Sequence, residues 1–343
     1  MPSAKLSLVP VPENGNWDDL VRRSPQGTLF SEKFFLEATG RNHHLYWVKQ
    51  GSETKAGVAL IVSDDGKSCE LDDLVIYGGI LFDLDPDRQL VKRRHDEFQI
   101  TEFVVEQMAR KYSSIELQLS PEFGDMRPFL WHRYHDQDKF KFSVDLRYTS
   151  CLDISSLQEF EGREEESPCL RNMETVRRYS IREARKKMGS VASADSSDTL
   201  VEFYRSLMDR QGVPQPSVKL SNMKKVIDVL LGMGRGVVYH VLNSAGTVIY
   251  SVCYGWDAKR AYYLFGAGHA DISEPWQGTL AHWEAFKDLA QRRGIKGVDL
   301  EGVNSPKRGW FKLGFGGDLR PYYKVCKNIP KRNWQAKPVQ EGK

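Results

Sequence analysis

Residues 298–323 read VDLEGVNSPKRGWFKLGFGGDLRPYY and hold an ordered succession of short elements. Apolar alternation predicts a strand over 297–300, and the aromatic segment RGWFKLGF at 308–315 has the spacing of a short helix. The Asn-Ser-Pro of 304–306 is typical of a helix start, because Asn and Ser cap and Pro fits the first turn. A strand is expected at 321–325. The segment therefore predicts a strand, a helix and a strand that close one α/β unit.

The rest of the second half leads into this segment through a hairpin, a strand and a helix. The hairpin spans 237–254 and turns at Asn-Ser-Ala-Gly, and the next strand, 261–265, runs into Gly-Ala-Gly. A helix follows, because its apolar residues recur at helical spacing. These residues are Leu280, Trp283, Phe286, Leu289 and Ala290. The order of elements is that of a mixed sheet with a helix on its face.

The first half repeats this order after a helix near 31–39. The repeated elements are a hairpin at 45–62, strands at 74–82, 115–119 and 140–146, and a helix at 100–111. Because the order recurs at a separation of about half the chain, duplication is indicated, although identity between the halves is slight. The expected fold class is mixed α/β, with two tandem modules that each contain a mixed sheet flanked by helices.

Composition shifts place the boundaries of these modules. We expect a first module at 1–150 and a second at 151–327, with a helical insertion at 171–232. The insertion follows an acidic run, EFEGREEE, and begins with a basic helix. The tail, 328–343, is expected either to pack on the first module or to lie free.

Composition excludes several classes of protein. The 343 residues have a formal net charge of +3, which lacks the strong basic signature of a dedicated DNA-binding protein. No apolar run is long enough to span a bilayer, and the start lacks the apolar core of a signal peptide. Five scattered cysteines fit neither a disulfide framework nor a zinc ribbon. We therefore expect a cytoplasmic enzyme with reduced thiols and no membrane span.

Familiar cofactor and metal motifs are not found. The sequence GMGRGVV lacks dinucleotide-loop spacing and precedes a strand, and neither a phosphate-binding P-loop nor a Gly-x-Ser-x-Gly elbow occurs. The histidine pairs His43, His44 and His132, His135 have no evident third ligand. We therefore expect no metal and no bound cofactor.

The candidate catalytic residues lie in the opening segment. Asp299 and Glu301 alternate onto one face of the strand, where one carboxylate could accept or orient an amine proton. Lys312, supported by Phe311, could stabilise an oxyanion. The same pattern is typical of a strand edge and a helix facing water, so both interpretations stand at this stage.

Candidate substrate-binding residues fall in two places. The basic helix NMETVRRYSIREARKKMG at 172–189 brings Arg178 and Arg182 onto neighbouring turns, where guanidinium groups could hold a diphosphate or an RNA backbone. A solvated helix face is the alternative. Backbone N–H groups at Asn304 could bind an anion. The other candidates for acceptor contacts are Arg308, His269, Tyr322 and Tyr323.

These motifs resemble a known family. The doubled module, the basic RRYSIREARKKMG helix, YYLFGAGH and DLEGVNSPKRGWFKLGFGG are similar to Fem-type aminoacyltransferases and the related amino-sugar N-acyltransferases. The resemblance implies two GNAT-like modules and direct acyl transfer to an amine. In Fem-type enzymes a Phe-Lys pair is associated with transfer, and it matches Phe311 and Lys312 here. The donor in those enzymes is aminoacyl-tRNA.

Two departures from the family pattern limit what the resemblance implies. The coiled-coil arm by which some Fem-type proteins contact tRNA is missing, and so is the Arg/Gln-x-x-Gly-x-Gly/Ala loop that holds coenzyme A in ordinary GNAT enzymes. The leading hypothesis is transfer from acyl-CoA to a nucleotide-linked amino sugar in O-antigen or capsule synthesis. The alternatives are tRNA-dependent aminoacyl transfer to a peptidoglycan precursor and a non-catalytic module that binds a glycan or a nucleotide.

Overall fold

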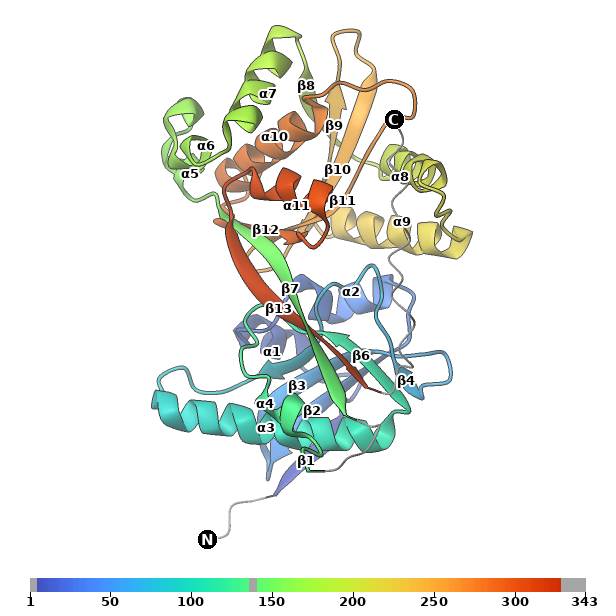
Figure 1. Ribbon diagram of the computed structural model, residues 1–343, viewed down its shortest axis with the longest axis vertical. Helices are drawn as coiled ribbons and strands as arrows, with labels where there is room; N and C mark the ends of the chain where they lie inside the picture. The colour runs from blue at the N-terminus through green and yellow to red at the C-terminus, as the bar shows by residue number, and fades with distance from the viewer. Residues whose placement is uncertain (1–4, 136–140, 328–343) are drawn as a thin grey trace.

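The computed structural model describes residues 5–135 and 141–327 and has two lobes stacked along its long axis (Figure 1). The N-terminal lobe lies below the C-terminal lobe in this view. A long twisted pair of strands, β7 (Phe142–Asp153) and β13 (Asp318–Lys327), runs from one lobe into the other. The lobes are therefore joined by β-pairing as well as by side-chain packing.

The N-terminal lobe contains an antiparallel sheet in the order β1-β2-β3-β5. Its strands are β1 (Leu6–Pro10), β2 (His43–Gln50), β3 (Glu53–Ile61) and β5 (Gly79–Phe82). Alternate residues face opposite sides, so Val58 packs on one helix, α3 (Leu90–Lys111), and Ala59 on another, α1 (Trp17–Arg23). The smaller helices are η1 (Leu29–Ser31), α2 (Lys33–Ala38) and α4 (Arg127–Trp131).

A nine-stranded mixed sheet extends through both lobes in the order β4-β6-β13-β7-β12-β11-β10-β9-β8. The other strands are β4 (Ser68–Cys69), β6 (Ser114–Gln118), β8 (Ser190–Ala194), β9 (Gly236–Leu242), β10 (Val248–Trp256), β11 (Ala261–Gly268) and β12 (Gly297–Gly302). The strands β7 and β13 are antiparallel partners. The C-terminal end of β13 pairs with β6 in the N-terminal lobe, and the C-terminal end of β7 pairs with β12 in the C-terminal lobe. The expected module boundary at residue 150 thus lies inside β7, which serves both lobes.

Helices cover both faces of the sheet in the C-terminal lobe. The helix α10 (Gln277–Gln291) packs on one face, with Trp283, Phe286 and Leu289 fully buried. The neighbouring elements on that side are α5 (Ser156–Glu159), η2 (Glu164–Glu166), α6 (Pro168–Arg171) and α7 (Thr175–Lys186). The other face carries α8 (Asp198–Arg210) and α9 (Ser217–Gly232), and the short helix α11 (Pro306–Leu313) lies beside β12.

The expected insertion at 171–232 is only partly helical. Between its helices, Ser190–Ala194 form the edge strand β8 on β9. The sequence SVASA is short and carries small side chains, so its alternation is too weak to predict a strand. The segment therefore contributes an edge strand to the nine-stranded sheet. The tail 328–343 lies outside the described residues.

The two lobes share a core at their junction. Phe30 and Tyr77 of the N-terminal lobe pack with Tyr262 and Val226 of the C-terminal lobe. Lys259 also reaches across, donating to the carbonyls of Ser24 at 2.5 Å and Gly27 at 2.8 Å. Those carbonyls follow α1, where a cation is favourable. The junction is thus a packed interface.

In the described part of the chain no helix combines the length and apolarity needed to cross a membrane. The five cysteines, Cys69, Cys151, Cys169, Cys253 and Cys326, are all free thiols. Burial raises the pKa of Cys253, which is enclosed in the sheet, so its thiolate is disfavoured. The thiols are thus structural in position.

Candidate active site

The largest concentration of candidate residues lies where two strands of the C-terminal lobe part. The parallel strands β11 and β12 pair only at Ala261 with Val298 and at Tyr262 with Asp299. Beyond that point α11 closes the gap and leaves a cavity of about 480 Å³. Side chains from α8, β10, β11, β12 and α11 line it, together with Asp73 of the N-terminal lobe. Glu301, Arg308, Phe311 and Lys312 all reach this cavity, as a common site requires.

Glu301 enters the cavity because β12 is irregular. The pairing of β12 with β7 shifts between Asp299 and Gly302, and Glu301 has a φ of +59°, which is unusual for a residue with a side chain. The side chain is only 8% exposed, and its Oε1 has no hydrogen-bond partner among the described residues. A buried, unpaired carboxylate oxygen is costly unless a ligand supplies a donor. The geometry therefore presents an acceptor to a substrate N–H.

Asp299 stabilises the irregular backbone at Glu301 through hydrogen bonds. Its Oδ1 accepts from the Glu301 backbone N–H at 2.7 Å and from Thr149 Oγ1 at 2.5 Å, and its Oδ2 accepts from Tyr77 Oη at 3.1 Å. Asp299 is fully buried and does not line the cavity. The sequence pattern predicts that Asp299 and Glu301 lie on one face of the strand over a cleft. The bulge in β12 breaks this alternation, so only Glu301 lines the cavity. Asp299 thus positions Glu301, and Tyr77 ties this arrangement to the N-terminal lobe.

Lys312 approaches Glu301 from α11. Its Nζ donates to the Gly302 carbonyl at 3.2 Å and lies 5.2 Å from the centre of the Tyr263 ring. Burial lowers the pKa of Lys312, although the nearby carboxylates oppose this effect. Burial likewise raises the pKa of Glu301, opposed by the Lys312 charge. The pKa values of Glu301 and Lys312 are therefore shifted toward each other.

Phe311 anchors α11 rather than facing only the cavity. The Arg177 guanidinium lies 4.4 Å from its ring centre, and Phe315 packs edge-on at 5.3 Å. Arg177 also donates to Thr279 Oγ1 on α10 at 3.1 Å. These contacts lock α7, α10 and α11 together, and the residue after Phe311 is Lys312. Arg177, in the basic helix, was not singled out in the sequence.

His282 lies behind the cavity as a buried neutral ring. It hydrogen-bonds Tyr254, its ring centre lies 4.6 Å from that of Tyr263, and its Nε2 has no partner within the described ranges. Burial, with smaller effects from Lys312 and Arg177, lowers the pKa of His282 to about 3. The ring stays uncharged across the pH range in which an enzyme works.

This neutral histidine predicts a pH-dependent stability. An unfolded histidine titrates near pH ~6.5, so between about pH 6.5 and 3 the unfolded state binds a proton that the folded state does not. Stability is therefore lost as pH falls. From pH 7 to 5.5 the wild type should lose roughly 1 kcal/mol more unfolding free energy than His282→Phe, measured by urea titration. Equal losses in both proteins would show that His282 is protonated in the folded state.

Cations occupy the mouth of the cavity. Lys307 and Arg308 line it from the first turns of α11, and Arg308 Nη2 lies 3.5 Å from Gln211 Oε1 after α8. Arg178 and Arg182 on α7 do not line it; Arg178 donates to Thr175 Oγ1 at 3.1 Å and Arg182 is exposed. The positive rim thus comes from α11.

Four further candidates form contacts within the protein. Asn304 accepts from the Tyr148 N–H at 2.8 Å, donates to its carbonyl at 3.1 Å, and donates to Tyr322 Oη at 3.2 Å. Tyr323 packs on the core of the N-terminal lobe. His269 Nδ1 accepts from the N–H groups of residues 271 and 272. None of the four lines the cavity, so their expected substrate contacts remain predictions.

Sequence reasoning missed the tyrosines that line the cavity. Tyr250, Tyr263 and Tyr204 converge there from β10, β11 and α8. A side chain on Gly266 would bring its Cβ within 2.3 Å of Tyr263 Oη and 3.0 Å of Tyr250 Oη. The Gly-Ala-Gly after the Tyr-Tyr pair was the available signal, since it marks a close approach at the end of β11.

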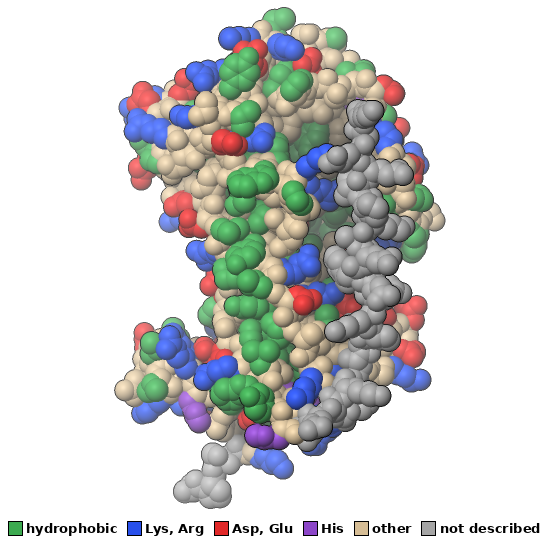
Figure 2. Space-filling view, in the orientation of Figure 1, with side chains coloured by type: hydrophobic (Ala, Val, Ile, Leu, Met, Phe, Trp, Pro, Cys, Tyr) green, Lys and Arg blue, Asp and Glu red, His purple; other side chains and the backbone are tan. Residues whose placement is uncertain are grey.

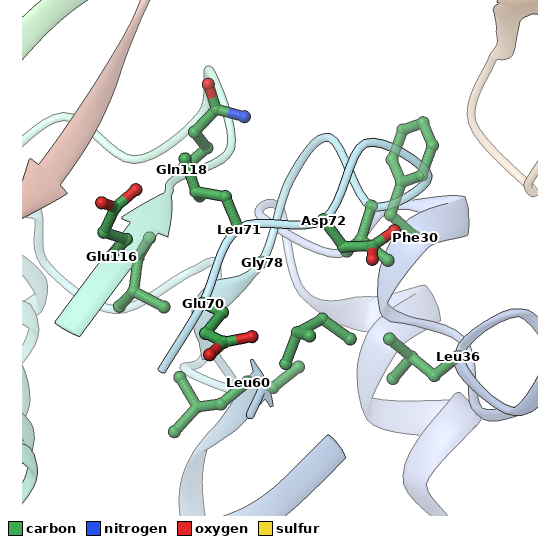
Figure 3. Close-up of a pocket in the computed structure, with 13 residues that line it drawn as sticks. Phe30, Leu36, Leu60, Glu70, Leu71, Asp72, Gly78, Glu116 and Gln118 are labelled. Atoms are coloured by element: carbon green, nitrogen blue, oxygen red, sulfur yellow. The ribbon is translucent and has the colours of Figure 1, made fainter. Parts of the chain in front are cut away.

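A much smaller space lies in the N-terminal lobe. Between β3 and β6, in the region drawn in Figure 3, the space amounts to about 20 Å³, enough for one water molecule. Apolar side chains such as Leu60 fill it, and the carboxylates of Glu70, Asp72 and Glu116 stand around it. Neither an acyl chain nor a phosphate fits there.

Metal binding finds no support in the arrangement of side chains. Within residues 5–135 and 141–327, no three His, Cys, Asp or Glu residues are grouped so that they could hold an ion. Glu301 and Asp299 face different surroundings, and Asp299 already accepts three hydrogen bonds.

Comparison with known proteins places this cavity in a familiar fold. Residues 175–311 match the model of the acetyltransferase (GNAT) domain family. Among solved structures, FemX is 14% identical with a TM-score of 0.64, and the alignment covers 92% of this chain and 96% of FemX. A tandem GNAT protein from the clavulanic acid biosynthesis pathway is 12% identical with a TM-score of 0.55, covering 95% and 99%.

A third structure, L-PGS from Bacillus licheniformis, is 10% identical with a TM-score of 0.53, and the alignment covers 94% of this chain and 95% of that chain. None of the curated proteins compared with the chain matched it. At these identities the likeness concerns the fold. The expected mixed α/β class with tandem GNAT-like modules is confirmed.

Proposed function

We propose that this chain, an acyltransferase of the GNAT fold, transfers an acyl group from acyl-CoA to the amine of a nucleotide-linked amino sugar in surface-glycan synthesis, such as O-antigen or capsule. The observation that carries the proposal is Glu301 Oε1, a buried acceptor without a partner among the described residues, in one cavity with Lys312. An amine nucleophile supplies the missing donor. A carbonyl oxygen next to it would meet the Lys312 charge.

The reaction follows from these two groups. The amine nitrogen attacks the thioester carbon, so a C–N bond forms and, as the oxyanion collapses, the C–S bond breaks. Glu301 accepts the proton that the amine loses, and Lys312 stabilises the oxyanion. The leaving thiolate then takes that proton from Glu301, which restores the carboxylate and gives free thiol as the second product. No covalent intermediate on the protein is needed.

Phosphates of the substrates fit the mouth of the cavity. Lys307 and Arg308 present an ammonium and a guanidinium group there, the residue types that hold phosphate oxygens. Arg178 and Arg182 remain candidates for the outer part of a long acceptor, because α7 adjoins α11 through Arg177. In this proposal acyl-CoA is a co-substrate, and no cofactor stays bound.

One observation favours a second candidate, tRNA-dependent aminoacyl transfer to a peptidoglycan precursor. At the start of α10 the loop carries Asp271 and Glu274, and Phe311 lies over the first turn, 3.3 Å from a Cβ built on Gly278. That helix end offers no cationic, glycine-rich cradle for a pyrophosphate. FemX, whose fold the chain shares, adds weight to this alternative.

A panel of donors and acceptors tests the proposal. Acyl-CoA thioesters and aminoacyl-tRNA are each paired with UDP- and dTDP-linked amino sugars and with peptidoglycan nucleotide precursors, and products are read by mass spectrometry. An N-acylated nucleotide sugar from acyl-CoA supports the leading proposal. Product only from aminoacyl-tRNA, with steep inhibition by salt, establishes the second candidate instead. Binding without any product would favour the non-catalytic module.

A further inference from the structure

A second cavity adjoins the first and crosses the boundary between the lobes. Its volume is about 360 Å³, and it lies between the loop 64–74 of the N-terminal lobe and the start of α9. Asp73, Tyr204 and Phe265 line both cavities. The two are therefore parts of one groove that passes the reaction centre, and we name the second part the side arm.

Hydrophobic and polar side chains share the walls of the side arm. Leu74, Leu220, Met223 and Phe265 are its half-buried or buried hydrophobic residues, and Val218 stands at its rim. Leu74, Met223 and Phe265 belong to one hydrophobic cluster, so this part of the wall suits an apolar moiety. Leaving such walls against water costs free energy that a hydrocarbon chain would recover.

The charges of the side arm are unfavourable for phosphate. Among the residues that line it, Arg41 already pairs with Glu70 at 2.7 Å, and Lys219 with Asp73 at 2.8 Å. Arg41 also pairs with Asp72 at 3.5 Å, and Asp64 adds a further negative charge to the lining. The first cavity, by contrast, has Lys307 and Arg308 in its lining. A phosphorylated group therefore belongs at the mouth, and an uncharged group in the side arm.

We propose that the side arm binds the acyl chain of the donor, and that this chain is uncharged and longer than acetyl. The inference rests on the proposed function, because it places the acyl carbonyl at Glu301 and Lys312. From that point the thioester's phosphate-bearing part extends toward Lys307 and Arg308, and the hydrocarbon extends past Tyr204 and Phe265. An acidic acyl group, such as succinyl, is excluded by the same carboxylates.

Binding of phosphate-free donors tests the inference apart from turnover. The affinities of acetyl-pantetheine and hexanoyl-pantetheine are measured by calorimetry for the wild type and for Val218→Trp, which narrows the rim of the side arm. Val213→Trp is the matched control, because Val213 is 57% exposed, similar to 62% for Val218, and lines neither cavity. Thermal melting checks that both variants are folded.

In the wild type and in Val213→Trp, hexanoyl-pantetheine should bind about 10- to 100-fold more tightly than acetyl-pantetheine, since each buried methylene adds affinity. In Val218→Trp this ratio should fall below about threefold while acetyl-pantetheine binding is unchanged. Equal affinities of the two thioesters for the wild type would overturn the inference. Turnover separates the proposed function from the proposed acyl-chain site. If acetyl-CoA and hexanoyl-CoA are used at equal rates, the proposed function stands and the side arm is not the acyl-chain site. If hexanoyl-pantetheine binds more tightly but no acyl-CoA is turned over, the apolar binding site stands and the proposed function does not.

Discussion

Replacing Lys312 by methionine is expected to lower kcat by about 10²- to 10³-fold with little change in KM, because an oxyanion loses its positive partner. Methionine has a similar length and stays unbranched, so α11 should keep its packing through Phe311 and Arg177. Steady-state kinetics with the donor and acceptor identified by the panel give both constants. The same substitution leaves Glu301 without a nearby cation, so the acid limb of the pH profile should move to higher pH.

Lys307→Met serves as the matched control on the same helix. Lys307 lines the mouth of the cavity, so its loss should raise the KM of a phosphorylated substrate and leave kcat nearly unchanged. If the two lysine variants behaved alike, with KM effects only, Lys312 would be a binding residue and the oxyanion would need another donor. Thermal melting of both variants shows whether either effect comes from misfolding.

Much of the fold follows from local patterns in the sequence. The helical stripe of Leu280, Trp283, Phe286 and Leu289 faces the sheet as predicted, because a buried face enforces a period of 3.6 residues. The hairpin of β9 and β10 turns at the expected residues, where Gly246 has a φ of +76°. Such elements are set by their own residues and their burial, so one sequence is enough.

Elements that depend on distant partners could not be predicted. The strand expected at 74–82 pairs as β5 only over Gly79–Phe82, because the preceding residues form the junction with the other lobe. The edge strand β8 has weak alternation and is defined by its pairing with β9. Likewise β7 and β13 serve both lobes, and nothing in their local sequence reports a partner over 150 residues away.

The candidate site shows the same division. Glu301, Phe311, Lys312 and Arg308 lie close in sequence and meet in one cavity, since a strand and a following helix keep them together. The bulge at Glu301 depends on hydrogen bonds from other elements to Asp299, so the period-2 pattern alone misplaced Asp299. Tyr204, Tyr250 and Asp73 also line the cavity, but they are distant in sequence and reach it only through the tertiary structure.

The N-terminal lobe acts on the site through Tyr77. Its hydroxyl donates to Asp299, and its ring packs edge-on against Tyr322 at 5.4 Å. Asp299 in turn accepts from the Glu301 N–H. The first lobe also supplies one wall of the side arm. The N-terminal lobe thus helps to shape the cavity that Glu301 and Lys312 line.

Glu301→Gln is expected to give the other large loss, about 10²- to 10⁴-fold in kcat, the range typical of a positioned proton acceptor. Glutamine keeps the size of the side chain and its hydrogen-bonding oxygen, but it cannot take the proton from the amine. Glu301→Asp is the matched variant, because it keeps the carboxylate and shortens its reach, and an intermediate rate is expected. Both are compared at saturating substrate, so that binding effects do not enter.

The pH profile separates proton transfer from mere contact. Burial raises the pKa of Glu301, so the wild-type rate should rise with pH as this carboxyl deprotonates, above the ordinary range of a glutamate. Burial lowers the pKa of Lys312, so the rate should fall again below the ordinary range of a lysine. In Glu301→Gln the rise should disappear and the fall remain. A variant that kept the rising limb would mean that water or another group removes the proton, and Glu301 would then only orient the amine.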